Sequence, residues 1–222
     1  MISKKQRLKN KEFKIYSQNG EDGIISYIFS KIKPKDYTFV EIGAGDGHEC
    51  NTATLKKLYD WQGRQIDTEF FATAENVNQL FKYQGNEIDL LSIDIDGNDY
   101  WIWKAIKCKP RVVVIEYNAS FGHRSITIPY DPNFKWTPAS DISFYHGASL
   151  KALTKLGEEK GYVLVGCESS GVNSFFVLKK YAKWFDKFTP EEAYYPHKRR
   201  CEKLTQEEQF DKIKHLEFVN IK

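Results

Sequence analysis

Apolar residues along the chain recur with two periods, one typical of helices and one of buried strands. The first helical stripe predicts a helix over residues 24–32 that ends before Pro34. Its apolar positions are Ile24, Ile25, Ile28, Phe29 and Ile32. A short apolar run follows at 37–42, and glycines come directly after it. The chain therefore begins with a helix, a strand and a glycine-rich turn.

The rest of the chain continues this alternation of strands and helices. Further strands are predicted at 64–66, 88–95, 112–115, 162–167 and 174–178, and helices at 50–59, 75–83, 100–106 and 149–160. A Ser-Ser-Gly turn joins the last two strands in a hairpin. Such alternation predicts an α/β fold with a mostly parallel sheet, helices on both faces and an antiparallel C-terminal hairpin.

Three parts of the chain differ in pattern. Residues 1–15 form a basic, weakly patterned N-terminal segment, which we expect to be a loose arm. Residues 16–178 carry the α/β pattern, and 179–222 read as a helical extension with exposed charges. Within the domain, 118–146 is irregular and rich in aromatic residues and proline, which favours a functional loop.

Composition narrows the class of protein. The chain has 222 residues with a net charge of +3, a balance that gives no reason to expect a nucleic-acid or membrane partner. Its four cysteines are scattered, as is usual for free thiols in a reducing compartment. No apolar stretch approaches the roughly 20 residues that span a bilayer, and no apolar segment follows the charged N-terminus. We expect a cytoplasmic protein.

The glycine-rich turn is the first candidate binding site. It reads Glu41-Ile42-Gly43-Ala44-Gly45-Asp46-Gly47, after a predicted strand and before a predicted helix. Glycines there allow a tight turn and close approach of a ligand. Because His48 breaks the GxGxxG pattern, a diphosphate is less favoured than a ligand with a cationic amino-acid end. Glu41 would suit the ammonium of methionine; the alternative is a tight turn without a ligand.

Asp67 is the second candidate, at the end of the next short strand. It lies 20 residues after Gly47. In nucleoside-binding α/β folds, an acid at this position takes the ribose hydroxyls. An exposed loop residue is the alternative.

Acids at the ends of two later strands form the third candidate. Asp94 and Asp96 follow one strand, and Glu116 and Asn118 end the next, so all four should lie at one sheet edge. The carboxylates of Asp94, Asp96 and Glu116 could hold a divalent cation. Alternatively they contact substrate or cofactor, one of them acting as general base. A third interpretation is helix capping, with Asp99 as N-cap.

Other polar residues are weaker candidates. The segment Ser17–Gly23 opens the first helix and is either an ordinary cap with acids at the helix N-terminus or part of a site. His146 lies in the aromatic loop and is a candidate base. Tyr130 and Tyr145 are expected to line an acceptor pocket.

Together these segments resemble the FkbM-type family of S-adenosylmethionine (SAM)-dependent methyltransferases over residues 16–178. The shared motifs are Ser17-Gln18, Gly20–Gly23, Phe39–Gly45, Leu91–Gly97 and Val113–Glu116. One branch of the family is resembled most closely, through Asn98–Trp101, Glu116–Asn118, Pro129–Pro132, Gly147–Leu150 and Gly171–Asn173.

The resemblance implies a Rossmann-like class I methyltransferase fold, SAM as cofactor, and O-methylation of a hydroxyl on a sugar or small-molecule acceptor. It also implies that Glu41, Gly43 and Gly45 hold the methionine end of SAM and that Asp67 holds the ribose. Ala44 and Asp94 are further candidates for cofactor contact. The acceptor stays open, because a fold does not fix a substrate.

One departure from the family bears on function. Only residues 68–74 separate Asp67 from the 75–78 segment, where the family has a helix and a strand. A parallel neighbour needs a crossover of about a dozen residues, so we expect the third, edge strand to be missing and the adenine pocket to be open.

Two other functions compete with the enzyme. A degenerate methyltransferase fold could serve as a non-catalytic binding or scaffold protein, as the shortened segment suggests. A nicotinamide-dependent oxidoreductase is disfavoured by the absence of GxGxxG. The extension after residue 178 could form a lid or a homo-oligomer surface.

Overall fold

Six strands form the central sheet of the computed structural model, which describes residues 5–66, 72–81, 87–137 and 142–222. Their spatial order is β2-β1-β3-β4-β7-β6. The strands are β1 Thr38–Ile42, β2 Gln62–Ile66, β3 Leu90–Ile93, β4 Val112–Glu116, β6 Tyr162–Cys167 and β7 Asn173–Leu178. The first four are mutually parallel, and β7 runs antiparallel between β4 and β6. This is the predicted Rossmann-like α/β fold, a mostly parallel sheet with a C-terminal antiparallel hairpin.

The described part of the sheet ends at β2, which agrees with the expectation that the third, edge strand is missing. Among the described residues, no strand pairs with the outer side of β2. The segment 67–71, which includes Asp67, lies outside the described part of the chain.

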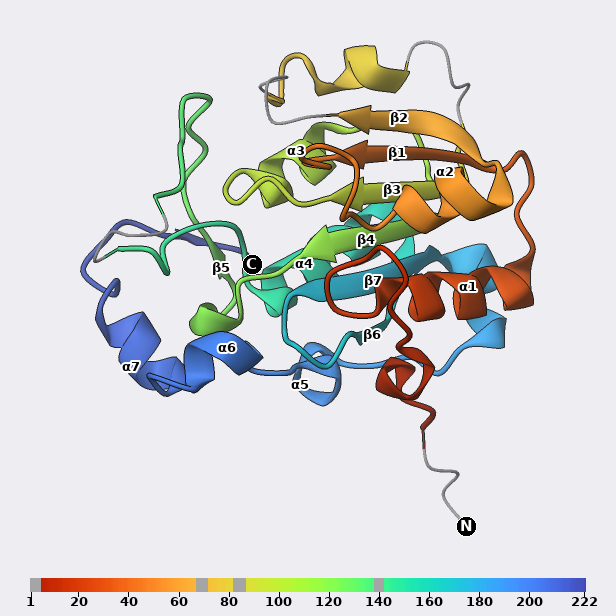
Figure 1. Ribbon diagram of the computed structural model, residues 1–222. Coiled ribbons are helices and arrows are strands. Elements are labelled where there is room, and N and C mark those ends of the chain that lie inside the picture. Colours follow the sequence, from red (N-terminus) through yellow and green to blue (C-terminus); the bar gives the residue numbers. More distant parts are fainter. Residues whose placement is uncertain (1–4, 67–71, 82–86, 138–141) are drawn as a thin grey trace.

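Helices cover both faces of the sheet (Figure 1). The helices α1 (Glu21–Ile32) and α2 (Ala53–Tyr59) pack on one face, and α3 (Asp99–Ala105) and α4 (Leu150–Lys160) on the other. Successive residues of a strand point to opposite faces. In β1, Phe39 therefore joins the α1 side of the core, whereas Val40 and Ile42 join the α3–α4 side.

One predicted helix is shorter than the sequence indicated. Over 75–83 the structure has only a 3₁₀-helix, η2, Val77–Phe81, before the chain leaves the described residues. A local turn precedes it, in which the Asn76 side chain accepts from the backbone N–H of Thr73 at 2.8 Å. The predicted apolar face of this segment is nevertheless buried.

The C-terminal extension consists of short helices with exposed charges, as predicted, and it also packs on the 118–146 loop (Figure 1). Its elements are η4 Lys179–Trp184, α5 Pro190–Ala193, α6 Lys198–Cys201, α7 Gln206–Asp211 and β8 Val219–Asn220. The loop contributes η3 (Ala119–Phe121) and β5 (Ile126–Thr127), and β5 pairs with β8. An apolar cluster around Phe121 and Ile213 joins the two segments. The prediction missed this contact because a two-residue strand has no readable period.

The N-terminal segment is also docked rather than loose. The 3₁₀-helix η1 (Leu8–Lys11) buries Leu8 against the core. The carboxylate of Glu12 accepts from the backbone N–H and the hydroxyl of Ser169 at 2.6 and 2.7 Å. In the part of the chain that the structure describes, no helix has the length and apolar character to cross a membrane.

Candidate functional site

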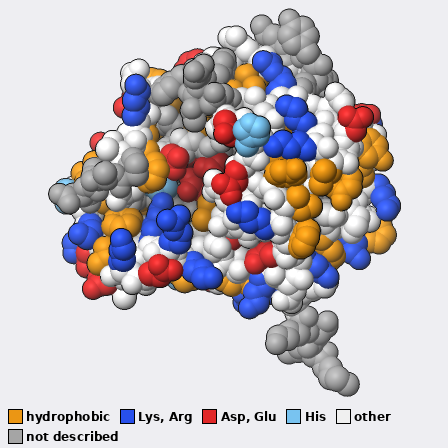
Figure 2. Space-filling model, in the orientation of Figure 1, with side chains coloured by type: hydrophobic (Ala, Val, Ile, Leu, Met, Phe, Trp, Pro, Cys, Tyr) orange, Lys and Arg blue, Asp and Glu red, His pale blue; other side chains and the backbone are white. Residues whose placement is uncertain are grey.

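The carboxyl ends of β1, β3 and β4 meet at one edge of the sheet, and the predicted acids lie there. Glu41 is in β1, Asp94 follows β3, and Glu116 ends β4. Carboxylate oxygens of Asp94, Asp99 and Glu116 lie within 4.8 Å of one another. Figure 2 shows acidic side chains gathered in a hollow on this face. The expectation that the two strand ends bring their acids together is confirmed.

The glycine-rich turn packs directly against this acid cluster. Gly43 has φ +90°, and a Cβ there would lie 1.6 Å from the carbonyl oxygen of Asp94, so only glycine fits. The backbone N–H groups of Gly43 and Ala44 both donate to the carbonyl of Ile66, at 3.1 and 3.0 Å. These bonds tie the turn to the end of β2.

Gly45 differs from its neighbours because one side of it is open. Its φ is +57°, its backbone is exposed, and no described atom lies within 4 Å of the position a Cβ would take. A ligand can therefore approach the backbone at Gly45 without displacing a described side chain.

Glu41 has partners inside the protein. Its Oε1 accepts from the backbone N–H of Asn51 at 2.9 Å, and its Oε2 accepts from the N–H and hydroxyl of Thr52 at 2.9 and 2.5 Å. The buried carboxylate thus anchors the start of α2, the end of a helix that favours negative charge. Contact between Glu41 and a ligand stays a prediction. A ligand would bind Glu41 in addition to these three hydrogen bonds.

Asp99 does not cap α3 in the predicted way. The helix begins at Asp99 itself, with Asn98 at the N-cap. Its two carboxylate oxygens accept from the backbone N–H groups of Ile95 and Gly97, both at 2.9 Å. The carboxylate therefore braces the turn that carries Asp94 and Asp96.

Burial raises the pKa of every acid in this cluster. The pKa values of Asp94 and Glu116 rise well above the ordinary range, first through burial and then through repulsion from neighbouring carboxylates. Burial also raises the pKa of Asp99, and it raises that of Asp96 to about 6. With a pKa of about 6, the carboxyl of Asp96 can accept or donate a proton near neutral pH.

Arg200 is a site residue that the sequence did not reveal. It comes from α6, and burial lowers its pKa, an effect that the nearby charges of Glu116 and Asp96 offset in part. Its Nη1 donates to Asn118 Oδ1 at 3.2 Å and to Ser120 Oγ at 3.4 Å. In the sequence, Arg200 belonged to the C-terminal extension, which was expected only to carry exposed charges.

The structure places His146, the predicted candidate base, beside the acid cluster. It is fully buried, and its Nδ1 lies 3.8 Å from Glu116 Oε2. Burial lowers its pKa well below the ordinary value, and Arg200 and His197 lower it further. Asn118 positions the loop here, because its Nδ2 donates to the carbonyls of Phe144 and His146 at 2.7 and 2.8 Å.

The two predicted pocket tyrosines are engaged away from these acids. The hydroxyl of Tyr130 donates to Glu75 at 2.6 Å. The hydroxyl of Tyr145 donates to the carbonyl of Glu217 at 2.5 Å, and its ring packs on Phe218. Their predicted contact with an acceptor stays a prediction, as does ribose binding by Asp67.

The polar segment that opens α1 also braces the site rather than simply capping the helix. Asp22 Oδ2 accepts from the backbone N–H groups of residues 15–17 at 2.8–2.9 Å. Glu21 accepts from the Asn173 side chain at 2.8 Å, and its charge is among those that raise the pKa of Asp94. The segment therefore belongs to the surroundings of the acid cluster.

Two sets of described residues bring groups that can ligate a metal within 4.8 Å of one another. They are Asp96, Glu116 and His146, and Asp94, Asp99 and Glu116. Carboxylate oxygens are the ligands that magnesium and calcium prefer. A cation at Asp94, Asp96 or Glu116 stays a prediction.

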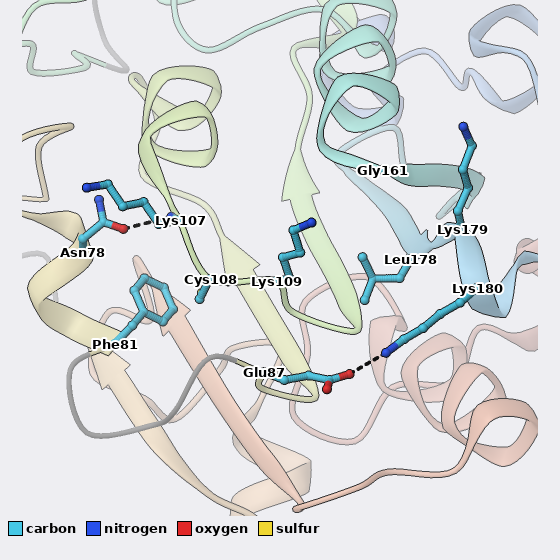
Figure 3. A pocket seen from close by; sticks show the side chains of 10 residues that line it. All are labelled: Asn78, Phe81, Glu87, Lys107, Cys108, Lys109, Gly161, Leu178, Lys179 and Lys180. Atoms are coloured by element: carbon cyan, nitrogen blue, oxygen red, sulfur yellow. Dashed lines mark hydrogen bonds and ion pairs between the residues drawn. The ribbon is translucent and has the colours of Figure 1, made fainter.

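A pocket of about 830 Å³ opens at the opposite, amino edge of the sheet (Figure 3). Lys107 and Lys109 precede β4 at this pocket, and Lys180 pairs with Glu87 at 2.8 Å. Burial raises the pKa of Cys108 to about 12, so this thiol stays protonated. Ligands of open α/β sheets bind at the other edge, and the pocket contains none of the predicted site residues.

Comparison with known proteins adds little to this picture. No family model matches the chain, and no curated protein matches its sequence. One similar solved structure is an O-methyltransferase family protein from Burkholderia thailandensis, with 10% identity and TM-score 0.32, covering 71% of this chain and 57% of that one. Another is spermidine synthase from Thermotoga maritima, with 19% identity and TM-score 0.34, covering 76% and 64%. The chain spans less than two thirds of either, and likenesses this slight carry no argument about activity.

Proposed function

We propose that the protein is a SAM-dependent methyltransferase of the FkbM type that methylates a hydroxyl of a sugar or small-molecule acceptor. The observation that carries the proposal is the turn after β1, where Gly45 is open to a ligand and Gly43 contacts Asp94 in a cluster of buried and half-buried acids. In open α/β sheets this edge is where ligands bind.

The cofactor would lie along this edge, from the turn after β1 to the end of β2. Gly43, Ala44 and Gly45 would follow its methionine end, and Asp67 would take the ribose. A carboxylate at Asp94 suits the positive charges of SAM, and Glu41 supports the turn from beneath through α2.

The acids beside it would supply the chemistry. Methyl transfer needs the acceptor oxygen in line with the methyl group, and a base for the hydroxyl proton. SAM bound here would supply the methyl group to the acceptor oxygen and leave as S-adenosylhomocysteine, and a carboxylate of the protein would take the hydroxyl proton. Glu116, Asp94 and Asp96 are the candidates, and the pKa of Asp96, raised to about 6 by burial, suits a base that works near neutral pH.

The test is release of S-adenosylhomocysteine from SAM in the presence of a panel of sugar and small-molecule hydroxyl acceptors. Glu116→Gln should lower turnover about 100-fold or more, whereas Glu158→Gln, an exposed change on α4, should leave it unchanged. Equal turnover of wild type and Glu116→Gln would remove Glu116 from the chemistry.

The non-catalytic alternative rests on the absence, among the described residues, of a strand beyond β2. It predicts that the folded protein releases no S-adenosylhomocysteine with any acceptor. The cation hypothesis is tested by titrating S-adenosylhomocysteine with and without magnesium. At least tenfold tighter binding with magnesium would support ligation by Asp94 and Asp96, and unchanged affinity would argue against it.

A further inference from the structure

We infer that Arg200 is a positioning residue that holds His146 as the neutral tautomer with its proton on Nδ1. In this state His146 presents an unpaired N–H donor toward the acid cluster, and is neither a base nor a metal ligand. The tautomer follows from the contacts alone; its use in methyl transfer rests on the proposed function.

The contact between the two side chains determines which nitrogen is protonated. Arg200 Nη2 lies 3.0 Å from His146 Nε2. A guanidinium has donors only, so Nε2 must be the acceptor. A neutral imidazole carries one ring proton, and that proton must then be on Nδ1.

The ring cannot easily escape this arrangement. His146 is fully buried, and its ring packs on Trp136 with the ring centroids 5.4 Å apart. A half-turn of the ring would place carbon instead of Nε2 against the guanidinium and forfeit the hydrogen bond. The loop backbone is fixed as well, because Asn118 binds the carbonyl of His146.

The charges around the ring favour its neutral form. Arg200 and His197 face it from the C-terminal segment, and both lower its pKa, as does burial. Glu116 faces it from β4, at 3.8 Å, and Asp96 from the turn after β3. The pKa values of both acids are raised, that of Asp96 to about 6, so each carboxyl keeps its proton to a higher pH than an ordinary carboxyl does.

The Nδ1–H is a buried donor that points toward Glu116. It has no hydrogen-bond partner among the described residues, and 3.8 Å is too long for a direct bond to Glu116. A buried donor without a partner costs free energy, which an oxygen bound beside Glu116 would recover. We assign this place to the acceptor oxygen, with Glu116 taking its proton.

Metal ligation by His146 conflicts with the same contact. Binding through Nδ1 would need its lone pair, and would move the proton to Nε2. Two donors would then face each other across 3.0 Å, with a cation added beside the guanidinium. The set of Asp96, Glu116 and His146 is therefore a poor metal site as long as Arg200 is in place.

The tautomer can be measured in the protein without any ligand. Long-range proton–nitrogen correlation spectra of protein labelled with ¹⁵N-histidine distinguish a protonated ring nitrogen from a bare one. The chain has five histidines, and the signal that disappears in His146→Gln assigns His146. We expect the Nδ1–H form from pH 6 to 8. An Nε2–H form, or a doubly protonated ring at pH 7, would overturn the inference.

Variants test the part played by Arg200. Arg200→Gln can donate or accept, so His146 should shift toward a mixture of tautomers; Arg200→Lys keeps a donor and should retain Nδ1–H. Arg199→Gln, an exposed change on the same helix, is the matched control and should leave the spectrum unchanged. A pure Nδ1–H signal in folded Arg200→Gln would show that Arg200 does not set the tautomer.

The spectrum tests the tautomer assignment, and the enzymatic experiments test the proposed function, so either claim can fail without the other. If SAM does not bind but His146 shows the Nδ1–H form, the proposed function fails and the tautomer assignment stands. Zinc added at equimolar concentration should not perturb the ring signals of wild-type His146. A zinc-dependent shift of Nδ1 in the wild type would contradict the assignment.

Discussion

The carboxylate of Glu41 at the end of β1 receives both the backbone N–H and the hydroxyl of Thr52, at 2.9 and 2.5 Å. A residue expected to meet a ligand is thus also the anchor of the following helix. Cofactor loss in a Glu41 variant therefore has two causes that must be separated.

Glu41→Ala should lower the free energy of unfolding by about 2–4 kcal/mol. The change removes a buried acceptor and leaves the N–H groups of Asn51 and Thr52 unpaired. Urea denaturation measures the effect. A loss below about 1 kcal/mol would show that the anchor is unimportant for stability.

Gly45→Ala separates ligand contact from folding more cleanly. The added methyl group meets no described atom, but it would occupy the space in which the cofactor is proposed to lie. Gly161→Ala is the matched control, because Gly161 also has a positive φ, +87°, and an equally open Cβ position, at the end of α4.

Both glycine variants should lose a similar, small amount of stability, about 1 kcal/mol, because both place a side chain in the left-handed region. Only Gly45→Ala should weaken binding of S-adenosylhomocysteine, by about tenfold or more, which is about 1.4 kcal/mol. Calorimetric titration of the two variants measures this. Equal affinities would place the cofactor elsewhere.

Asp96→Asn should stabilise the protein more at pH 7 than at pH 4. Burial raises the pKa of Asp96 to about 6, above the unfolded value near 4, so the folded protein holds its proton more tightly. Its favourable contribution is complete below the unfolded pKa and is lost as pH rises through about 6. Asparagine does not ionise, so the stability of the variant does not fall in this way as pH rises.

The gain of Asp96→Asn over wild type should therefore grow by about 2 kcal/mol between pH 4 and pH 7. The change with pH is the diagnostic, because Asp96 has φ +51°, a conformation that asparagine also tolerates, and any backbone effect is independent of pH. Chemical denaturation at both pH values measures the difference. A constant difference would contradict the raised pKa.

Asp89→Asn should lower stability by about 3–5 kcal/mol, because it leaves the buried charge of Arg111 without its partner. The two side chains lie 2.6 Å apart at the amino edge, with exposed fractions of 1% and 6%. Guanidinium unfolding measures the loss. Affinity for S-adenosylhomocysteine, measured at low temperature without denaturant, should not change, because this pair lies away from the carboxyl edge. A tenfold loss of affinity would contradict that separation.

Much of the fold could be predicted from the sequence, because buried strands and amphipathic helices have readable periods. The β-branched run of β4 and the hairpin of β6 and β7 are examples. The acids at the ends of β3 and β4 could be placed together because parallel strands end at one edge.

The rest of the site depends on contacts that no local pattern encodes. Arg200 reaches His146 from 54 residues away along the chain, through an extension whose helices are only a few residues long. Asp99 accepts bonds from the turn before it, although its position equally suggested a helix cap. A tertiary contact decided the first, and the local conformation of the turn before α3 decided the second.

The most direct test of the central claim is calorimetric titration of the wild-type protein with S-adenosylhomocysteine. The account predicts one site per chain, with a Kd on the order of 1–10 μM. Absence of binding by protein that unfolds cooperatively would contradict it, and would favour a methyltransferase fold used as a non-catalytic scaffold.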